Sequence, residues 1–375
     1  MAHYPRPPYK DPSVAAKTIQ PMFSPTPLTV PEPDYPVTPL ENFRLAVERK
    51  TPYWMPNSTL DFDAFMSGFL TGPVLPPEAP ADAGPWGATT RSVFTDDWGA
   101  QWLFVPEAGG PMLDPNGKPV LEDITQWEKT VKFPNLKAMD WKSRAEDFMK
   151  NRYNPRKVLH INIGQGCTER FVALLGGYTE AMVAMADEPE ACRAFFDAFA
   201  EWEIEQFDII HSLYPVNLVT YHDDWGTERD TFFSEKMMEA MVLEPTRKIV
   251  QHIKDKGVYF ELHSCGAITR FLPYMIDMHI DLLQIQRRAN DMPKMKEEKG
   301  DKIGFCCFIE GIEMGQPVSR DQTLAAIRKT VDLYGKKGGS YTFASGGGSD
   351  EDSWAAVFEL YCYSREFYDK ERGAA

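Results

Sequence analysis

Residues 258–266 read Val-Tyr-Phe-Glu-Leu-His-Ser-Cys-Gly, and this stretch decides the interpretation of the whole chain. Its apolar start, Val258 to Leu262, is typical of a short buried strand, and the run from Ala267 to Met278 is typical of a helix. On an extended backbone, side chains two residues apart point to the same side, so His263 and Cys265 would share one side at the strand's carboxyl end. An imidazole and a thiolate make a zinc-binding pair that needs a third protein ligand. The alternative is a buried histidine and cysteine that only pack.

Strands and helices alternate on both sides of this stretch. The other strand patterns are followed by helical patterns, and they lie at 158–163, 216–221, 282–286, 303–308 and 340–344. This alternation is typical of a parallel sheet. With Tyr53–Met55 and one or two strands in the segment 61–140, the count reaches about eight, so we predict one (β/α)8 TIM barrel over residues 41–375. A doubly wound sheet is the second interpretation, disfavoured because no Gly-x-Gly-x-x-Gly opens a helix.

Two segments depart from this alternation. Residues 1–40 contain 11 of the 30 prolines, which lack the N–H that helices and sheets need, so we predict an extended arm. Its apolar side chains favour an arm that lies on its own surface or on a neighbouring subunit, which would make a homodimer. The segment 61–140 is aromatic and rich in glycine and proline, and we expect an insertion near the barrel mouth that forms a lid or pocket wall.

Composition limits the classes of partner and compartment. The net charge is −15 and no run of Lys and Arg stands out, which argues against a nucleic-acid partner. The six cysteines form no disulfide framework, which fits a reducing cytoplasm. The first residues lack a signal-peptide core, and no stretch has 18 consecutive apolar residues, so we expect a cytoplasmic protein without a membrane partner.

Polar side chains gather where five of the predicted strands end. In a barrel the active site lies at these carboxyl ends. The residues are Gln165 and Cys167; Tyr221, His222, Asp223 and Asp224; Glu261, His263 and Cys265; Gln284 and Gln286; and Cys306, Cys307 and Glu310. Ser345 and the glycines 346–348 end the last strand, where the glycines would let the backbone approach an anion or form a flexible turn.

The sequence alone does not decide which residue would be the third zinc ligand. Cys307 is the first choice because it lies nearer its strand end than Cys306 does. Cys306 and Glu261 are alternatives, as are the carboxylates of Asp223 and Glu310. Core packing is the other explanation for the two cysteines, because free cysteine is among the most buried residue types.

The remaining candidates are acid–base and aromatic residues. A carboxyl at Asp223 or Asp224 in an apolar mouth would have a raised pKa and serve as a general acid or base, although a turn or helix cap is the alternative. The tryptophans that suit a planar ligand, with core packing as the alternative, are Trp54, Trp98, Trp102 and Trp225.

Several of these segments together resemble the uroporphyrinogen decarboxylase superfamily, and within it the cobalamin-dependent methyltransferases. They are 221–226 (Tyr-His-Asp-Asp-Trp-Gly), Glu244-Pro245, 262–266 (Leu-His-Ser-Cys-Gly) and 280–286 (Ile-Asp-Leu-Leu-Gln-Ile-Gln), preceded by 95–102 and 123–127. The resemblance covers about residues 40–370, and the spacing from Asp-Asp-Trp-Gly to His-x-Cys-Gly is its most specific part.

Two departures from the family's patterns narrow the function. Uroporphyrinogen decarboxylases carry an arginine-rich motif near the first strand, whereas residues 53–58 read Tyr-Trp-Met-Pro-Asn-Ser, which argues against porphyrin decarboxylation. Coenzyme M methyltransferases complete a zinc site with a later cysteine near the last strand, where this chain has Ser345.

The resemblance therefore implies the first methyltransferase of a bacterial O-demethylase system. Such an enzyme moves the methyl group of a methoxylated aromatic to Co(I) of a separate corrinoid protein. We assign catalysis to His222, Asp223, Asp224 and His263, zinc binding to His263, Cys265 and Cys307, and substrate binding to Trp54, Gln165, Tyr221, Trp225 and Gln286. The alternatives are a methylthiol, methylamine or coenzyme M methyltransferase, a decarboxylase, or a non-catalytic barrel.

Overall fold

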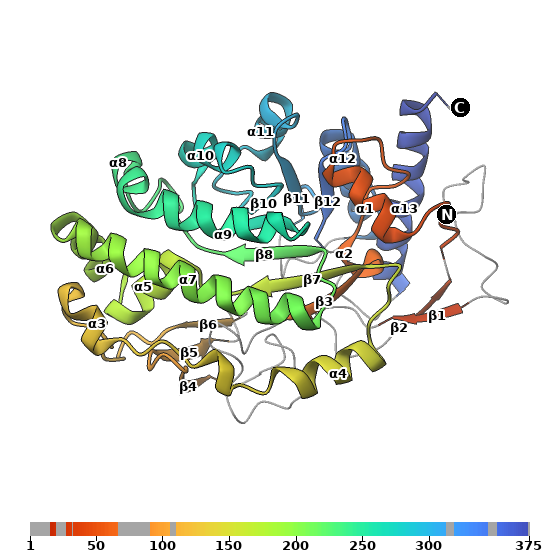
Figure 1. The fold of residues 1–375 in the computed structure, drawn as a ribbon. Coiled ribbons are helices and arrows are strands. Elements are labelled where there is room, and N and C mark those ends of the chain that lie inside the picture. Colours follow the sequence, from red (N-terminus) through yellow and green to blue (C-terminus); the bar gives the residue numbers. More distant parts are fainter. Residues whose placement is uncertain are drawn as a thin grey trace.

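A computed structural model describes residues 16–19, 28–31, 33–66, 91–105, 110–312, 319–343 and 351–373. Its centre is a seven-stranded, wholly parallel sheet (Figure 1). In spatial order the strands are β12 (Ser340–Thr342), β11 (Gly304–Cys307), β10 (Leu282–Ile285), β9 (Tyr259–Ser264), β8 (Leu218–His222), β7 (Val158–Ile163) and β3 (Phe62–Met66). The order follows the sequence without reversal, so the sheet has no switch point and the doubly wound alternative is wrong.

The sheet is strongly curled. In a flat sheet the edge strands β3 and β12 would lie about 29 Å apart, because neighbouring strands are spaced by about 4.8 Å. Instead the rings of Phe62 on β3 and Tyr341 on β12 stack with centroids 5.2 Å apart. An isolated parallel bridge between Asn57 and Thr342 further links β12 to the segment that precedes β3. The structure is thus an α/β fold with a curled parallel sheet. Within the described residues this sheet has seven strands, where we predicted a barrel of about eight.

The two faces of the sheet bury different kinds of side chain. The outer face is apolar and packs on the helices through residues such as Ile161, Val219, Leu262 and Leu283. The inner face has an apolar floor at the strands' amino ends, where Phe43 of α1 (Pro39–Val47) packs on Phe62 and Tyr341. Helix α1 is stabilised at its start by a reciprocal Thr38–Glu41 capping box, as a Thr-Pro-x-Glu start favours. Because α1 covers the floor, a site on the inner side has its access at the carboxyl ends.

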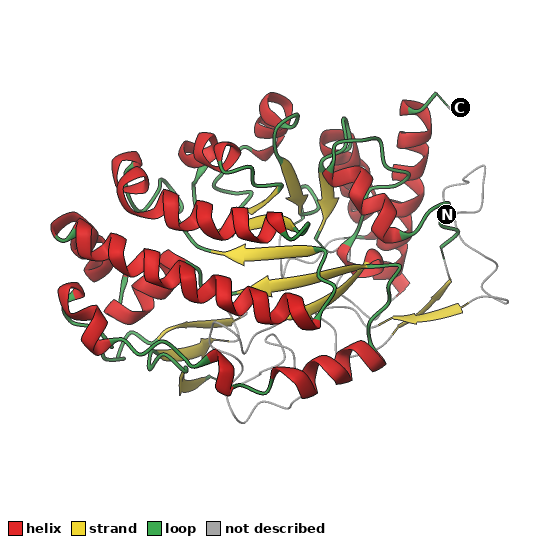
Figure 2. Cartoon of the chain, in the orientation of Figure 1, coloured by secondary structure: helices red, strands yellow, loops and turns green. Residues whose placement is uncertain are grey.

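Helices that connect the strands surround the outer face (Figure 2). They are α5 (Cys167–Leu175), α6 (Tyr178–Asp187), α7 (Pro189–Leu213), α8 (Glu235–Met237), the π-helical turn η4 (Met238–Val242), α9 (Leu243–Asp255), the 3-10 turn η5 (Thr269–Phe271), α10 (Leu272–Asp277), α11 (Met292–Lys299), α12 (Arg320–Tyr334) and α13 (Glu351–Glu371). Ser234 caps α8 through a hydrogen bond from the Met237 amide, and η4 lies between α8 and α9.

The aromatic segment between β3 and β7 forms a small substructure of its own. It contains the antiparallel sheet β4 (Ser92–Thr95), β5 (Gln101–Val105) and β6 (Gly110–Leu113), followed by η2 (Ile124–Gln126), α3 (Trp127–Thr130), η3 (Leu136–Ala138) and α4 (Trp141–Asn151). A buried ion pair of 2.6 Å between Asp96 and Arg170 ties this sheet to α5. Strands β4 and β5 pair antiparallel, with Thr95 opposite Gln101.

The amino-terminal part contributes two further elements. Strands β1 (Ala16–Ile19) and β2 (Leu28–Pro31) pair antiparallel, and the other residues before Pro33 lie outside the described part of the chain. The predicted strand at Tyr53–Met55 is wrong: this segment is irregular, and the strand lies at Phe62–Met66. The flanking Pro52 and Pro56 lack the N–H that a sheet requires, which explains the difference.

Within the described ranges, no helix is both long and apolar enough to cross a membrane.

The small helix α2 (Ser58–Asp61) is capped by Asn57, whose side chain accepts a hydrogen bond from the Thr59 amide.

Candidate metal centre

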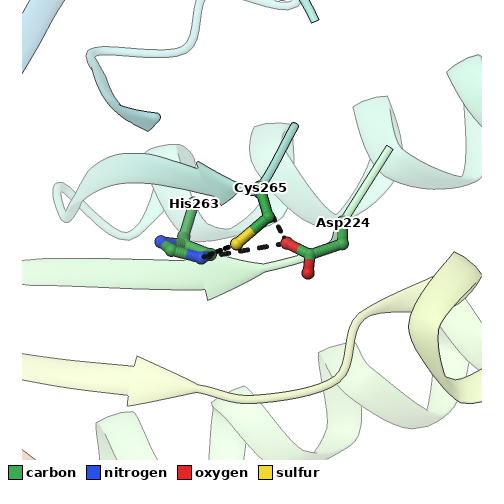
Figure 3. A group of neighbouring side chains, drawn as sticks. All are labelled: Asp224, His263 and Cys265. Carbon is green, nitrogen blue, oxygen red and sulfur yellow. Dashed lines mark hydrogen bonds and ion pairs between the residues drawn. The ribbon is translucent and has the colours of Figure 1, made fainter. Parts of the chain in front are cut away.

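The pairing of β8 with β9 places the ends of both strands side by side. His222 lies opposite His263 in the register, and the chain then continues into Asp224 after β8 and into Cys265 after β9. Figure 3 shows that the side chains of Asp224, His263 and Cys265 point toward one another. Their ligand atoms all lie within 4.8 Å of each other, and all three residues are half-buried.

The spacing of these three donors fits a divalent metal ion. The His263 Nε2 atom lies 3.6 Å from Cys265 Sγ and 3.8 Å from Asp224 Oδ1. Around tetrahedral zinc, ordinary bond lengths place nitrogen and sulfur ligands about 3.6 Å apart and nitrogen and oxygen ligands about 3.4 Å apart. Three protein ligands would leave one position open for a substrate atom. The group therefore has the donor types and the spacing of a catalytic zinc site.

The charges around the thiol also favour a cation. Burial, and then the nearby carboxylates of Asp224 and Glu169, raise the pKa of the Cys265 thiol. Burial and the same Asp224 carboxylate raise the pKa of Glu169, on the first turn of α5. A cation bound here would offset this negative charge and favour the thiolate.

Asp223 has a different place from Asp224. Its Oδ1 accepts hydrogen bonds from the Thr168 amide and hydroxyl and from the Glu169 amide, and its Oδ2 accepts one from the Trp225 indole. Burial raises its pKa to about 6. Its Oδ1 thus caps the start of α5, a helix that precedes β8, whereas the alternative from the sequence was a turn or a cap of the helix that follows.

His222 stacks on His263 with ring centroids 4.2 Å apart, and its Nε2 lies 3.3 Å from Asn162 Oδ1. Burial and the neighbouring His263 lower its pKa, so it is a neutral imidazole. The predicted catalytic histidines are therefore adjacent, and His263 is the one in the metal-ligand group.

The other predicted ligands do not join this group. Cys307 packs in the core between the sheet and the helices, with its thiol 3.7 Å from the Phe305 carbonyl oxygen. Cys306 is on the inner face, 3.7 Å from Gln284 Nε2. Glu310 pairs with Arg287 at 3.5 Å. Glu261 is fully buried below His263. Ser345 and the glycines 346–348 lie outside the described residues.

The predicted substrate-binding residues lie in several places. Trp54 is buried against Tyr35 and donates its indole N–H to Asp61. Tyr221 is buried on the outer face, where its hydroxyl accepts from the Cys167 amide. Trp225 is fully buried.

Gln165 and Gln286 lie closer to the strand ends. Gln165 follows β7 with a left-handed backbone (φ 62°), and its buried Oε1 has no hydrogen-bond partner among the described residues. Strained conformations of this kind often occur at binding sites. Gln286 accepts from the Gly266 amide and donates to Glu228, so it holds the loop after β9.

Sequence reasoning missed two features of the site. Gln284 was singled out only as a polar strand end, yet its Oε1 lies 2.7 Å from His263 Nδ1. Tyr178, at the start of α6, stacks on Phe232 with centroids 4.4 Å apart and is 43% exposed. Burial and then the charges of Glu169, Asp224 and Cys265 raise the pKa of Tyr178. Tyr178 was missed because it lies at the start of a helix, whereas the sequence pattern points to polar residues at strand ends.

Comparison with known proteins identifies the family. The profile of the uroporphyrinogen decarboxylase (URO-D) family matches residues 93–348, which is more than half of the chain. The chain belongs to the uroporphyrinogen decarboxylase family. This confirms the resemblance drawn from the Asp-Asp-Trp-Gly and His-x-Cys-Gly segments. No curated protein matches this URO-D family chain in sequence.

Solved structures support the fold of this URO-D family member. A methyltransferase from Methanosarcina mazei matches with a TM-score of 0.60 and 12% identity, covering 88% of this chain and 99% of that chain. At this identity the similarity concerns the fold. A sugar phosphate isomerase/epimerase from Parabacteroides distasonis, at 12% identity, covers 66% of this chain and 82% of that chain, but its TM-score is only 0.31.

The ligand set can be tested by zinc affinity. Replacing Asp224 by Asn removes a charged oxygen donor, and we expect the affinity to fall at least about tenfold, since even outer-shell partners contribute that much. Cys307→Ala should leave the affinity unchanged because Cys307 lies outside the group. Competition with a chromophoric chelator measures both, and thermal unfolding checks their folding. Loss of affinity only in Cys307→Ala would restore Cys307 as the third ligand.

The two loops of the site also depend on a contact between glycines. A Cβ added at Gly266 would lie 2.1 Å from the Gly226 carbonyl carbon, and Gly266 has φ +79°. Gly266→Ala should therefore destabilise the protein by about 2–5 kcal/mol, from the clash and the left-handed backbone together. It should also weaken zinc binding, because Asp224 and Cys265 lie on the two loops in contact.

The matched control is Gly257→Ala. Gly257 also has positive φ (+77°), but an added Cβ meets nothing within 4 Å. This variant should lose only about 1–2 kcal/mol and keep its zinc affinity. Urea unfolding compares the two, and equal losses would show that the glycine contact does not matter.

Proposed function

We propose that this protein is a methyltransferase that moves the methyl group of a methoxylated aromatic compound to Co(I) of a separate corrinoid protein. The observation that carries the proposal is the Asp224–His263–Cys265 group at the carboxyl ends of β8 and β9. It is supported by membership of the URO-D family and by the fold shared with a methyltransferase.

The reaction breaks the bond between the ether oxygen and the methyl carbon. The electron pair of that bond stays on the oxygen, while Co(I) supplies the pair for its new bond to carbon and becomes Co(III). The phenolate takes up a proton from solvent. Since phenolate is a poor leaving group, activation of the ether oxygen is the demanding part. Zinc held by these three residues would supply a Lewis acid for that oxygen.

The residues of the chain divide this work between holding ligands and shaping the site. Asp224, His263 and Cys265 are the ligands. Asp223 positions α5, because its Oδ1 accepts from the Thr168 and Glu169 amides at the start of that helix, while its Oδ2 accepts from the Trp225 indole. Gln286 fixes the loop of Cys265 by accepting from the Gly266 amide at 2.8 Å.

An aromatic methyl donor suits the wall of this site. Tyr178 and Phe232 form a stacked pair, Tyr178 is partly exposed, and the charges of Asp224 and Cys265 are among those that raise the pKa of its phenol. A ring placed on such a pair gains offset or edge contacts with the aromatic faces. The predicted Trp98 and Trp102, in contrast, are buried: Trp98 packs on Phe199 and Trp202 of α7, and Trp102 lies on β5.

The test is an anaerobic visible spectrum of a Co(I) corrinoid protein mixed with this protein and a panel of methoxylated phenols. We expect formation of methyl–Co(III) together with the free phenol. Conversion only with a methylamine, a methylthiol or methyl coenzyme M would replace the aromatic ether as donor. No conversion with any donor, while a control methyltransferase converts the same corrinoid protein, would contradict the proposal.

A pair of histidine variants locates the reaction. His263→Ala should lower the rate by at least about 100-fold, because a ligand contributes at least as much as its outer-shell partners. His252→Ala is the matched control: His252 is on helix α9, where it pairs with Asp208, and this variant should keep the wild-type rate. A His263→Ala protein that folds and retains activity would move the chemistry away from the group.

A further inference from the structure

A chain of hydrogen bonds runs from His263 into the buried interior of the sheet. His263 Nδ1 lies 2.7 Å from Gln284 Oε1, which is its partner in the β9–β10 register. Gln284 Nε2 lies 3.1 Å from Glu261 Oε1. Glu261 precedes His263 by two residues on the same side of β9, and its side chain is fully buried. The chain therefore links the metal-ligand group to a carboxyl in the interior.

The direction of these hydrogen bonds is determined by Glu261. Its Oε1 also accepts from the Thr220 hydroxyl at 2.7 Å and from the Tyr341 hydroxyl at 2.9 Å. Thr220 Oγ1 is in turn 2.6 Å from His160 Nε2, and it can accept from that atom while it donates to Glu261. An oxygen that receives several donors requires the amide NH2 of Gln284, not its carbonyl oxygen, to face it.

The second hydrogen of that amide has an acceptor as well, because Gln284 Nε2 lies 3.7 Å from Cys306 Sγ. With both hydrogens of the amide used on this side, Gln284 Oε1 faces His263 and can only accept. His263 must then carry its proton on Nδ1. The lone pair is left on Nε2, the atom that lies 3.6 Å from Cys265 Sγ.

We propose that Gln284 and Glu261 are positioning residues that fix the Nδ1–H tautomer of His263 and so present Nε2 to a divalent cation. The proposal rests on the metal-binding part of the function proposed above. Glu261, an alternative ligand from the sequence, is linked here through two hydrogen bonds to His263 Nδ1, the ring nitrogen that faces away from the metal-ligand group. Partners of this kind orient a ligating imidazole and contribute about 10–100-fold to metal affinity.

The tautomer of His263 can be observed directly in the zinc-free protein. Two-dimensional ¹H–¹⁵N spectra of histidine-labelled protein distinguish the two neutral tautomers, and the His263 signals are assigned by their loss in His263→Ala. The wild-type protein should show the Nδ1–H form. An Nε2–H form in the wild type would overturn the proposal without any need for a folded variant.

Three variants then separate positioning from packing. Gln284→Met keeps the approximate size of the side chain but removes the acceptor, so His263 should gain the Nε2–H tautomer and zinc affinity should fall about 10–100-fold. Glu261→Met removes the group that orients Gln284 and should move both readouts in the same direction. Glu261→Gln is the matched control, because its amide oxygen can accept from the same three donors, and it should restore the wild-type tautomer and affinity.

The outcomes are distinct from those of the methyl-transfer assay. A folded Gln284→Met protein with an unchanged tautomer and an unchanged zinc affinity would overturn the positioning role. The same changes in Glu261→Gln as in Glu261→Met would show that packing or charge, and not the acceptor, matters. A protein with the expected tautomer that transfers no methyl group to Co(I) would keep this inference and overturn the proposed function.

Discussion

The register between β8 and β9 is the constraint on which the site depends. With His222 opposite His263, the chain leaves both strands at the same level, and the loops 223–226 and 264–266 run next to each other. The contact between Gly226 and Gly266 permits an approach that side chains would prevent. The Cys265 amide then donates to Asp224 Oδ1 at 2.6 Å, so the backbone of one loop orients the carboxylate of the other.

The interior beneath this register is layered. At the bottom, aromatic side chains of α1, β3 and β12 close the sheet around an apolar floor. Above the floor lies a buried polar layer in which Glu261 accepts hydrogen bonds from Thr220 on the neighbouring strand β8 and from Tyr341 on β12, which is not a neighbour of β9. Buried polar groups are costly without partners and rigid with them. A polar layer of this kind gives the ligands above it a fixed base, which a catalytic metal site requires.

The sequence predicted the parts of this arrangement that follow from local periodicity. Strand β7 has the predicted bounds 158–163, and the shared side of His263 and Cys265 follows from the two-residue period of a strand. The choice of third ligand was beyond that reasoning. Cys306 and Cys307 necessarily face opposite sides, and only the three-dimensional structure shows that Cys307 faces the helices.

Asp223 and Asp224 illustrate the same limit in a loop. Both follow β8, and in a loop the two-residue period of a strand no longer predicts the direction in which each side chain points. The long-range contacts of Asp223 with the start of α5, 54 and 55 residues away in sequence, determine that Asp224 is the one left to face His263. Gln284 was visible as a polar strand end, but its role depends on the register between β9 and β10.

X-ray absorption at the zinc edge of the zinc-loaded protein tests the Asp224–His263–Cys265 ligand set most directly. These ligands predict one sulfur neighbour at about 2.3 Å, with imidazole nitrogen and carboxylate oxygen neighbours at about 2.0–2.2 Å. Such a spectrum would match Cys265, His263 and Asp224 as the ligand set. Two sulfur neighbours would contradict it, because a second cysteine would then have to join His263 and Cys265 in place of the carboxylate.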